Sequence, residues 1–298
     1  MHAWEAIQKT VEHIEDNITE ELKVEYLADI AHLSSFYYQR LFSRLVKKPV
    51  AEYIKLRRLA RSTEALLNEE TRILDVAVEY GFNDHSIYTK NFKSSYGVTP
   101  DEYRKNPVRL NHFNKPELLL NYTTIDKDVP LITESIVIEI TRKTLDKTRL
   151  FNGFSCEINI KNQIPLGEST GIDNAGQLQE KYRKEESKIP NLLPDCISIG
   201  ASYPSERDGY FNYFVGGEVE NKAKDFASFE MTSGEYITCS VEAETFEELV
   251  SVSLGKGMNY LMGIWMPKHK IEIEPYSIEM YTGTDQNPPN VEIWVKVK

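Results

Sequence analysis

The chain has 298 residues, enough for two domains that each bury a core of their own. Hydrophobic residues make up 41% of it and charged residues 27%, the composition of an ordinary globular protein. No apolar run approaches the roughly 18–20 residues that a membrane helix needs, and the first residues lack the apolar core of a signal peptide. We therefore expect a cytoplasmic protein without a membrane partner.

Residues 1–105 are predicted to be almost entirely helical, because apolar residues recur there at spacings of three and four, and residues 1–108 are expected to form the first domain. Most of the formal net charge of −11 falls on the later part of the chain. The segment 40–61 instead holds eight basic residues against one acid, Glu52. Such a patch is either a solvated helix face or a surface that binds a polyanion, and its acidic surroundings favour the second reading.

The helical part repeats itself after 50 residues, so that Phe42 falls on Phe92 and Tyr53 on Tyr103. Each copy is predicted to contain a short helix, a tight turn and a longer helix. Ser34 caps the longer helix of the first copy, and Asn83 or Asp84 caps that of the second. Gly97 ends the second longer helix, after which Thr99, Pro100 and Glu102 form a capping box that starts a new helix.

Helix–turn–helix geometry presents its second helix to the major groove of DNA. A predicted helix over Val50–Leu67, roughly 27 Å long at 1.5 Å per residue, lies between the two copies. Successive major grooves on one face of B-DNA lie about 34 Å apart, so one chain could place two helices in adjacent grooves without dimerising. The alternative is a helical bundle whose self-similarity is a coincidence.

The stretch GFNDHSIYTKNFKSSYGVTPDEYR resembles the signature of the AraC/XylS transcription regulators, and residues 5–105 match that DNA-binding domain. His32 and Lys47 depart from the pattern, since each stands where a glycine would suit a turn with positive φ. The resemblance implies base contacts from Phe36, Gln39 and Arg40 in the first copy and from His85, Ser86, Thr89 and Lys90 in the second. Gln and Arg suit bidentate contacts to adenine or guanine, whereas Phe36 suits a thymine methyl group.

These assignments have alternatives. Arg40 and Lys90 could contact phosphate alone, and His85 could be a capping residue. Candidates for phosphate contacts, which fix register without reading sequence, are Ser34, Arg44, Arg57, Arg58, Arg61 and Asn83.

Residues 109–129 are predicted to be a linker, because prolines and asparagines interrupt the helical pattern there, apart from a short helical patch near Glu117. Residues 130–298 then contain short runs of β-branched and aromatic residues bounded by turn residues. Two helical stretches, 176–188 and 246–262, lie between these runs. We expect an α+β domain with a mainly antiparallel sheet.

The second domain carries no motif of hydrolytic or redox catalysis: G-x-S-x-G, H-E-x-x-H and a P-loop are absent from the sequence. Cys156, Cys196 and Cys239 form no C-x-x-C pair and are interpreted as structural thiols. No cofactor or metal is expected. Carboxylates do lie beside aromatic residues, with Glu292 near Trp294 and Glu279 near Tyr281, and each pair shares one face of its strand.

Those faces either meet solvent or line a cleft. In a cleft, a carboxylate among aromatic rings would bind a lipophilic cation. Residues 130–298 resemble the GyrI-like effector-binding domain in the runs YFVGGEVEN, EYITCSV and VEIWVKVK, and the order of domains is Rob-like. That resemblance implies a buried pocket glutamate, with Glu292 the better match and Glu279 the second. The remaining ligand-binding candidates are Trp294, Tyr281, Trp265 and Tyr213.

The sequence thus predicts a transcription regulator whose partners are promoter DNA, a small cationic or amphipathic effector and RNA polymerase. Two alternatives remain open for the second domain. Some members of the GyrI-like fold are hydrolases that use such a glutamate, and others bind proteins.

Overall fold

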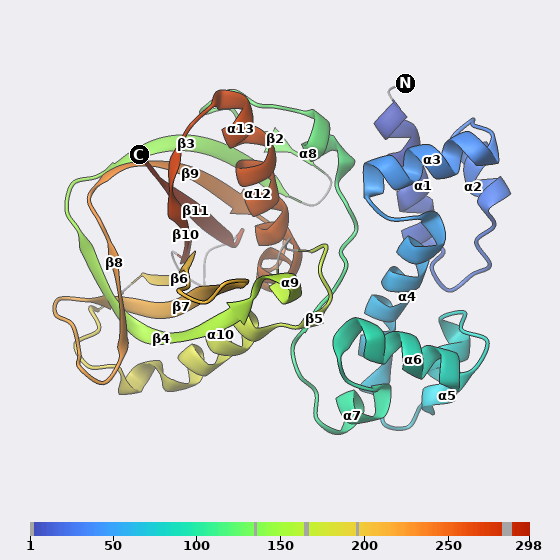
Figure 1. Ribbon diagram of the computed structural model, residues 1–298, viewed down its shortest axis with the longest axis horizontal. Helices are drawn as coiled ribbons and strands as arrows, with labels where there is room; N and C mark the ends of the chain where they lie inside the picture. The colour runs from blue at the N-terminus through green and yellow to red at the C-terminus, as the bar shows by residue number, and fades with distance from the viewer. Residues whose placement is uncertain (1–2, 134–135, 164–166, 195–196, 282–287) are drawn as a thin grey trace. The chain divides into compact units, whose positions relative to one another are not determined.

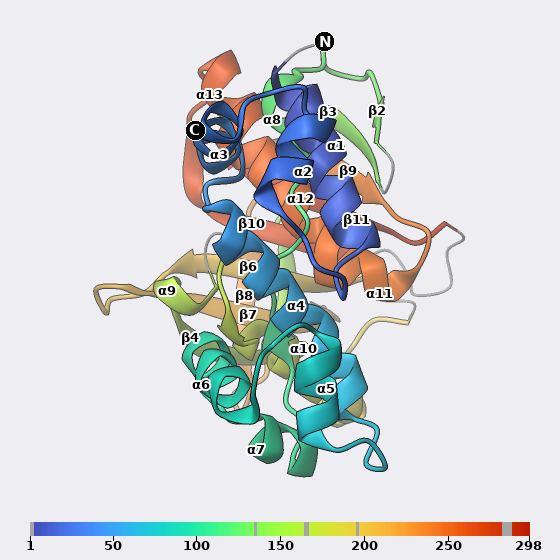
Figure 2. The same ribbon diagram turned by 90° about the vertical axis from the view of Figure 1, so that its right-hand side faces the viewer.

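The computed structural model describes residues 3–133, 136–163, 167–194, 197–281 and 288–298, and these form two compact units (Figures 1 and 2). The first unit comprises Met1–Thr123 together with Gly167–Ile172, and the second comprises Thr124–Leu166 together with Asp173–Lys298. The segment 109–123, predicted to belong to a linker, is therefore part of the first unit. None of the helices in the described ranges combines the length and the apolarity that crossing a bilayer requires.

The first unit is helical. Its helices are α1 (Ala3–Asp16), α2 (Val24–Ile30), α3 (Ser35–Val46), α4 (Val50–Leu66), α5 (Ile73–Glu79), α6 (His85–Tyr96), α7 (Pro100–Lys105) and α8 (Leu118–Tyr122). A short strand, β1 (Leu110–Asn111), pairs antiparallel with β5 (Gly171–Ile172).

Helix ends in this unit follow local side-chain chemistry. The Ser34 hydroxyl accepts a hydrogen bond from the Tyr37 amide, and the Asp84 carboxylate accepts one from the Ile87 amide at 2.8 Å. Asp84 rather than Asn83 is thus the cap of α6. Thr99 and Glu102 form the predicted capping box of α7.

The equivalent ends of the two longer helices share a left-handed backbone. Helix α3 ends at Lys47 with φ of 63°, and α6 ends at Gly97 with φ of 80°. His32, in the turn between α2 and α3, has φ of 56°. Side chains other than glycine are strained there, so both departures from the glycine pattern have an energetic cost.

Two apolar clusters hold the first unit together. One joins α1, α2, α3 and the first half of α4, and it also contains Phe113 and Leu118 from the segment after α7. The other joins the second half of α4 to α5, α6 and α7, and it contains Leu110 of β1. Helix α4 contributes to both clusters. Burial of Leu110, Phe113 and Leu118 explains why the predicted linker residues belong to this unit.

The second unit is a nine-stranded sheet in the order β2-β3-β9-β11-β10-β6-β7-β4-β8. The strands are β2 (Leu131–Ile132), β3 (Val137–Leu145), β4 (Arg149–Asn159), β6 (Ser198–Pro204), β7 (Tyr210–Val219), β8 (Ala227–Met231), β9 (Gly234–Glu242), β10 (Ile273–Tyr281) and β11 (Asn290–Val297). Each described pair of neighbours is antiparallel, as predicted.

The helices of the second unit are α9 (Ile160–Gln163), α10 (Asn174–Glu185) with a 3-10 turn (Glu186–Lys188), and a continuous helical stretch made of α11 (Phe246–Glu248), α12 (Leu254–Tyr260) and α13 (Met266–His269). Two π-helical turns, Leu249–Ser253 and Leu261–Trp265, interrupt this stretch.

Helices α10 and α12 cover the same face of the sheet. Cross-strand partners share a face, and the register runs from Val215 through Gly200 and Glu279 to Ile293. Val215 packs in the cluster of α10, whereas Gly257 of α12 lies against Ile293. The other face is filled by a second apolar cluster, which includes Phe214 and Ile278, and the sheet curls around it (Figure 1).

Candidate functional site

The first turns of α3 present side chains to solvent. The Phe36 side chain is 68% exposed and packs edge-to-face on Tyr37, with 5.6 Å between the ring centroids. Gln39 and Arg40 follow on the exposed side of the same helix. A Gln39 Nε2 hydrogen bond to the Ser35 carbonyl, at 3.3 Å, holds the amide along the helix. These three predicted base contacts therefore share one exposed surface at the start of α3.

Helix α6 offers a more polar surface at the equivalent place. His85, Ser86 and Lys90 are exposed. Thr89 is only partly exposed, and its hydroxyl oxygen is buried without a hydrogen-bond partner in the structure. Thr89 can therefore present its methyl group to a base, but its hydroxyl points away from solvent.

The predicted phosphate contacts divide into two groups. Ser34, Arg44, Arg61 and Asn83 are exposed. Arg57 and Arg58 are not available as predicted, because both use their guanidinium groups inside the protein. These two assignments are corrected.

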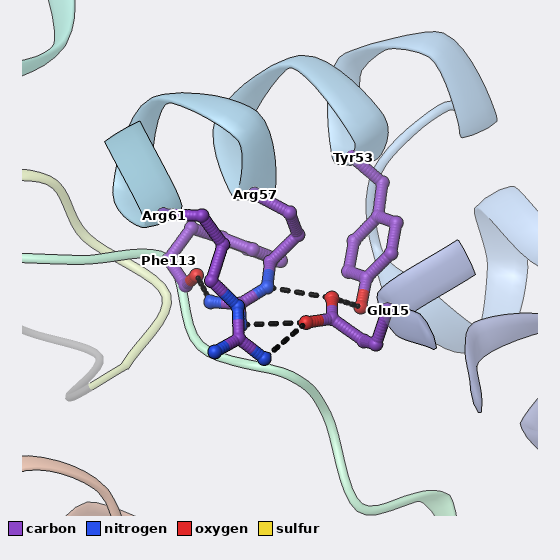
Figure 3. A network of polar contacts seen from close by, with 5 residues as sticks. All are labelled: Glu15, Tyr53, Arg57, Arg61 and Phe113. Carbon is purple, nitrogen blue, oxygen red and sulfur yellow. Dashed lines mark hydrogen bonds and ion pairs between the residues drawn. The ribbon is translucent and has the colours of Figure 1, made fainter. Parts of the chain in front are cut away.

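Arg57 is the centre of a buried network that ties α4 to α1 (Figure 3). Its Nε and Nη2 donate to the two carboxylate oxygens of Glu15, each at 2.7 Å, and its Nη1 donates to the Phe113 carbonyl at 2.7 Å. Tyr53 donates to Glu15 Oε1 at 2.7 Å, and Arg61 lies 3.5 Å from Oε2. Burial alone would raise the pKa of Glu15, but Arg57, with Tyr53 and Arg61, outweighs it and lowers that pKa.

Arg58 fastens the segment after α1 to the turn after α5. Its Nε donates to the Ile18 carbonyl at 2.8 Å and its Nη2 to the Glu20 carbonyl at 2.6 Å, while Nη1 lies 3.4 Å from the Gly81 carbonyl. Partial burial lowers the pKa of Arg58. Its role in the structure is to satisfy loop carbonyls.

A buried carboxyl group with two tyrosines lies on the helix-covered face of the second unit. Glu279 of β10 is 7% exposed, and its Oε2 accepts hydrogen bonds from Tyr213 at 2.8 Å and Tyr281 at 3.0 Å. Gln179 of α10 donates to both tyrosine hydroxyl oxygens, at 2.7 Å and 3.0 Å. Each hydroxyl hydrogen is thereby directed to Glu279, because its oxygen already accepts a bond from the amide. The structure thus unites three predicted ligand-binding residues.

Electrostatics make this carboxyl group unusual. Burial raises the pKa of Glu279, the hydrogen bonds from Tyr213 and Tyr281 act against that shift, and the charge of Asp173 adds to it. Burial, followed by the nearby Glu279 charge, raises the pKa of both tyrosines, which stay protonated donors. Within the described residues no lysine or arginine pairs with Glu279, and a buried carboxyl group in such surroundings favours a nearby ligand cation.

Gly200 and Gln179 belong to this cluster, and sequence reasoning missed both. A Cβ on Gly200 would lie 2.5 Å from the Tyr213 hydroxyl and 2.6 Å from Glu279 Oε2, so the glycine makes room for the cluster. The signal for Gly200 was a glycine inside the strand run CISIGASY, a pattern that often marks a close approach. No signal in the sequence pointed to Gln179.

Glu292 was expected to be the buried pocket carboxylate, with Glu279 the second choice, but Glu279 is the more buried of the two. Glu292 faces Met280, not Glu279, across the β10–β11 ladder, so the two glutamates project from opposite faces of the sheet. Its carboxylate is already occupied, since Lys143 donates to Oε1 at 2.6 Å and Trp294 Nε1 donates to Oε2 at 3.0 Å.

Both predicted tryptophans lie apart from the Glu279 cluster. Trp294 shares the face of Glu292 and packs edge-to-face on Tyr236. Trp265 is 3% exposed, stacks on His269 with 4.0 Å between centroids, and donates from Nε1 to the Ile125 carbonyl at 2.9 Å. Their environments are structural.

The thiols and metal ligands of the described ranges form no further site. Cys156 and Cys239 are free, and burial raises the pKa of both thiols. Cys196 lies outside the described residues. The described part of the chain brings together no three side chains of the types that hold a metal ion.

Comparison with known proteins identifies the family of the first unit. A family model described as a helix-turn-helix domain matches residues 27–106. The HTH-type transcriptional regulator YbfP of Bacillus subtilis is 38% identical over 104 residues, 35% of this chain and 35% of YbfP. The HTH-type transcriptional activator AarP of Providencia stuartii is 30% identical over 98 residues, 33% of this chain and 73% of AarP. The chain belongs to the AraC/XylS family.

The first unit is therefore a DNA-binding domain of the kind that AraC/XylS transcription regulators carry. The chain spans about a third of the length of YbfP, and the match to AarP covers a third of this chain. Among solved structures, that of SAV2435 bound to tetraphenylphosphonium is similar over 54% of this chain and 94% of that chain, with 16% identity and a TM-score of 0.40.

Proposed function

We propose that this AraC/XylS regulator reads an asymmetric DNA site with α3 and α6 and binds a small lipophilic cation at Glu279. The DNA-binding part of the proposal is supported by the exposed side chains on the first turns of α3 and α6. The ligand-binding part is supported by the buried Glu279 carboxyl with its two tyrosine donors. Both parts are one mechanism, because the ligand would alter how the chain acts on a promoter.

The two helix pairs, α2 with α3 and α5 with α6, act as two helix–turn–helix readers in this proposal. Each longer helix would enter a major groove with its N-terminal residues facing base edges. Helix α4 has 17 residues, which corresponds to roughly 26 Å, close to the ~34 Å between successive grooves. A single chain would therefore contact two adjacent groove segments, and their sequences would differ because the two helices carry different side chains.

Direct reading falls to a few side chains. Gln39 suits adenine and Arg40 suits guanine through two hydrogen bonds each, and Phe36 offers an apolar contact to thymine. On α6, His85, Ser86 and Lys90 are the polar contacts, and Thr89 contributes a methyl group. Ser34, Arg44, Arg61 and Asn83 would bind phosphate and hold the register.

In the second unit, Glu279 would supply the charge that selects a cation, and Tyr213 and Tyr281 would supply the aromatic surface. A cation over an aromatic ring gains about 0.5–2 kcal/mol, with the larger value in a desolvated site. A bound cation would lower the pKa of the carboxyl group, because an opposite charge within a few ångströms favours the charged form. RNA polymerase is the protein partner through which such a regulator would act.

Selection of duplex DNA from a random library tests the DNA-binding part. The full-length protein should enrich a site with two dissimilar half-sites about one helical turn apart. Arg40→Ala should reduce affinity for the selected site far more than for random DNA, because Arg40 reads a base. Arg44→Ala should weaken both about equally and flatten the salt dependence by about one unit, since it binds phosphate. A palindromic site, or no enrichment, would contradict two unlike readers in one chain.

Calorimetric titration with tetraphenylphosphonium, with neutral triphenylphosphine oxide as the matched compound, tests the ligand-binding part. The cation should bind and the neutral compound should bind much more weakly. Glu279→Gln should abolish this preference, whereas Glu292→Gln, on the opposite face, should retain it. If both variants bind the cation like the parent protein, Glu279 is not the charge-recognising group.

A further inference from the structure

The chain passes through the first unit twice, and its second passage is short. Residues 167–172, here named the strap, belong to the helical unit, although the residues before and after them in the sequence belong to the sheet unit. Ile172 pairs with Leu110 and Gly171 with Asn111, and the Asn114 amide donates to the Gly167 carbonyl at 2.7 Å. The strap thus contains a short strand that pairs within the first unit although it interrupts the sequence of the second.

The strap lies where it can influence a reading helix. Strand β5 contacts α6 directly. Its partner Leu110 is buried in the same apolar cluster as Tyr88, Phe92 and Tyr96, the inward face of α6. The Tyr96 hydroxyl also lies 2.9 Å from His112 Nδ1, just after β1. Any displacement of β1 and β5 would therefore change the packing of α6.

The C-terminal end of the strap leads directly into α10, the helix that carries Gln179 of the Glu279 cluster. Ile172 is followed at once by Asp173, which caps α10 by accepting a hydrogen bond from the Gly176 amide at 2.9 Å. Gln179 lies six residues further on, about 9 Å along the helix. Its amide holds the hydroxyl groups of Tyr213 and Tyr281, the donors to Glu279. One short helix thus joins the strap to the carboxyl group.

The ladder that pairs the strap with β1 is short. The chain between residues 113 and 125 is held at Phe113 by Arg57. At Ile125 it is held by Trp265 and by Tyr260, whose hydroxyl accepts from the Ile125 amide at 3.1 Å. The strap is held by a ladder of two residue pairs and by the hydrogen bond from the Asn114 amide to the Gly167 carbonyl. A two-stranded ladder of this length is marginal in water, so it can exist in a paired and an unpaired arrangement at modest cost.

We propose that the strap and α10 couple the two sites, so that binding of a cation at Glu279 changes how stably β5 pairs with β1 and packs against α6. This inference rests on the proposed function. A cation that draws Glu279 and its tyrosines towards itself alters the hydrogen bonds that Gln179 makes to those tyrosines. Because Gln179 lies on α10, the helix then moves together with its capping residue Asp173 and with the strap. The ligand binds the paired and unpaired arrangements of the strap with different affinity, which is the condition for any such coupling.

A reversible disulfide across the ladder tests the proposal in the full-length chain. Leu110→Cys and Ile172→Cys are made together, since these residues are direct partners. Dissociation constants for the selected DNA site are measured with and without saturating tetraphenylphosphonium, in the oxidised and the reduced protein. Peptide mapping verifies the 110–172 bond, and each single variant serves as control. In the reduced protein the cation should change DNA affinity by about 5-fold or more. In the oxidised protein it should still bind but leave DNA affinity unchanged, and reduction should restore the effect.

A verified disulfide that leaves the effect of the cation intact would overturn the proposal, as would failure of the two thiols to bond under oxidising conditions. A parent protein that binds both DNA and the cation but shows no coupling would overturn the proposed control by ligand, and the strap mechanism with it. Gln179→Met gives an independent reading: cation binding should persist while its effect on DNA affinity falls towards none. Gln177→Met, two residues away on the same helix, should leave the effect unchanged.

Discussion

Arg57 and Glu15 form a bidentate ion pair that is buried between α4 and α1, with both nitrogen–oxygen distances at 2.7 Å. The Glu15 side chain is 5% exposed and that of Arg57 is 9% exposed. Since Arg57 also donates to the Phe113 carbonyl, the pair fastens the segment that follows the DNA-binding helices. An arginine in the most basic segment of the chain is therefore structural.

Arg57→Met should destabilise the first unit by about 3–5 kcal/mol, because it leaves the Glu15 carboxylate buried without its partner. Urea unfolding followed by circular dichroism measures the change. Arg61→Met, which removes a 3.5 Å contact from a side chain that is 55% exposed, should cost less than about 1 kcal/mol. Equal effects of the two substitutions would contradict the assigned roles.

The same pair predicts how stability depends on pH. The pKa of Glu15 is lowered in the folded protein, so the unfolded chain binds more protons between the folded and the unfolded pKa. The contribution of Glu15 is therefore fully present above an unfolded pKa of about 4.3 and is lost as the pH falls through the lowered folded value. Urea midpoints of the parent protein should fall in this acid range more steeply than those of Arg57→Met.

Replacing Lys47 with glycine should stabilise the first unit by about 1 kcal/mol, since its φ of 63° is strained for a residue with a Cβ. The reciprocal change, Gly97→Ala at φ of 80°, should destabilise by a similar amount even though nothing lies within 4 Å of the added methyl group. Thermal unfolding measures both. If the two changes shift the midpoint in the same direction, backbone strain is not the cause.

Cation binding should strengthen as pH rises and should release a proton. Burial raises the pKa of Glu279 in the free protein, and a bound cation would lower it, so the affinity increases between the two values. Titration calorimetry in buffers of different ionisation enthalpy counts the protons released. Glu292→Gln should release the same number. An affinity that is flat with pH, with no proton released, would show that Glu279 does not ionise on binding.

Gly200→Ala should impair the cation site by at least roughly tenfold in affinity, because the methyl group would clash with the Tyr213 hydroxyl and Glu279 Oε2. Overpacking of this kind also costs about 1–3 kcal/mol of stability. Gly263→Ala, with nothing within 4 Å, is the matched control and should bind the cation like the parent protein. Unimpaired binding by Gly200→Ala would mean that the cluster is not as tightly packed as described.

Much of the first unit follows from local chemistry. The capping box at Thr99 and the end of α6 at Gly97 are readable because the residues that stop and start a helix act on their own neighbours. The helix predicted over Val50–Leu67 is observed as Val50–Leu66. Burial of Arg57 was harder to predict, although its place four residues after the core residue Tyr53 puts both on one face of α4.

Less of the second unit could be read from the sequence. The quoted runs YFVGGEVEN, EYITCSV and VEIWVKVK contribute to β7, β9 and β11, but β4, whose pattern Asn152 and Gly153 break, was not singled out from the sequence. Gly153 is there because the backbone of Val215 and Gly216 approaches it, a contact between distant segments. The sequence favoured Glu292 whereas burial favours Glu279, for the same kind of reason. Alternation puts them in pairs with Trp294 and Tyr281, but only the neighbouring strands and helices decide which face receives the cluster.

The account as a whole is tested most directly by thermodynamic linkage between the two sites. The dissociation constant of the full-length protein for its selected DNA is measured with and without saturating tetraphenylphosphonium, and that for the cation with and without saturating DNA. We predict that the two ratios are equal, as linkage requires, and differ from one by about 5-fold or more, and that Glu279→Gln abolishes the effect. Ratios of one in both directions, with both ligands bound, would contradict a regulator that couples DNA reading to cation sensing.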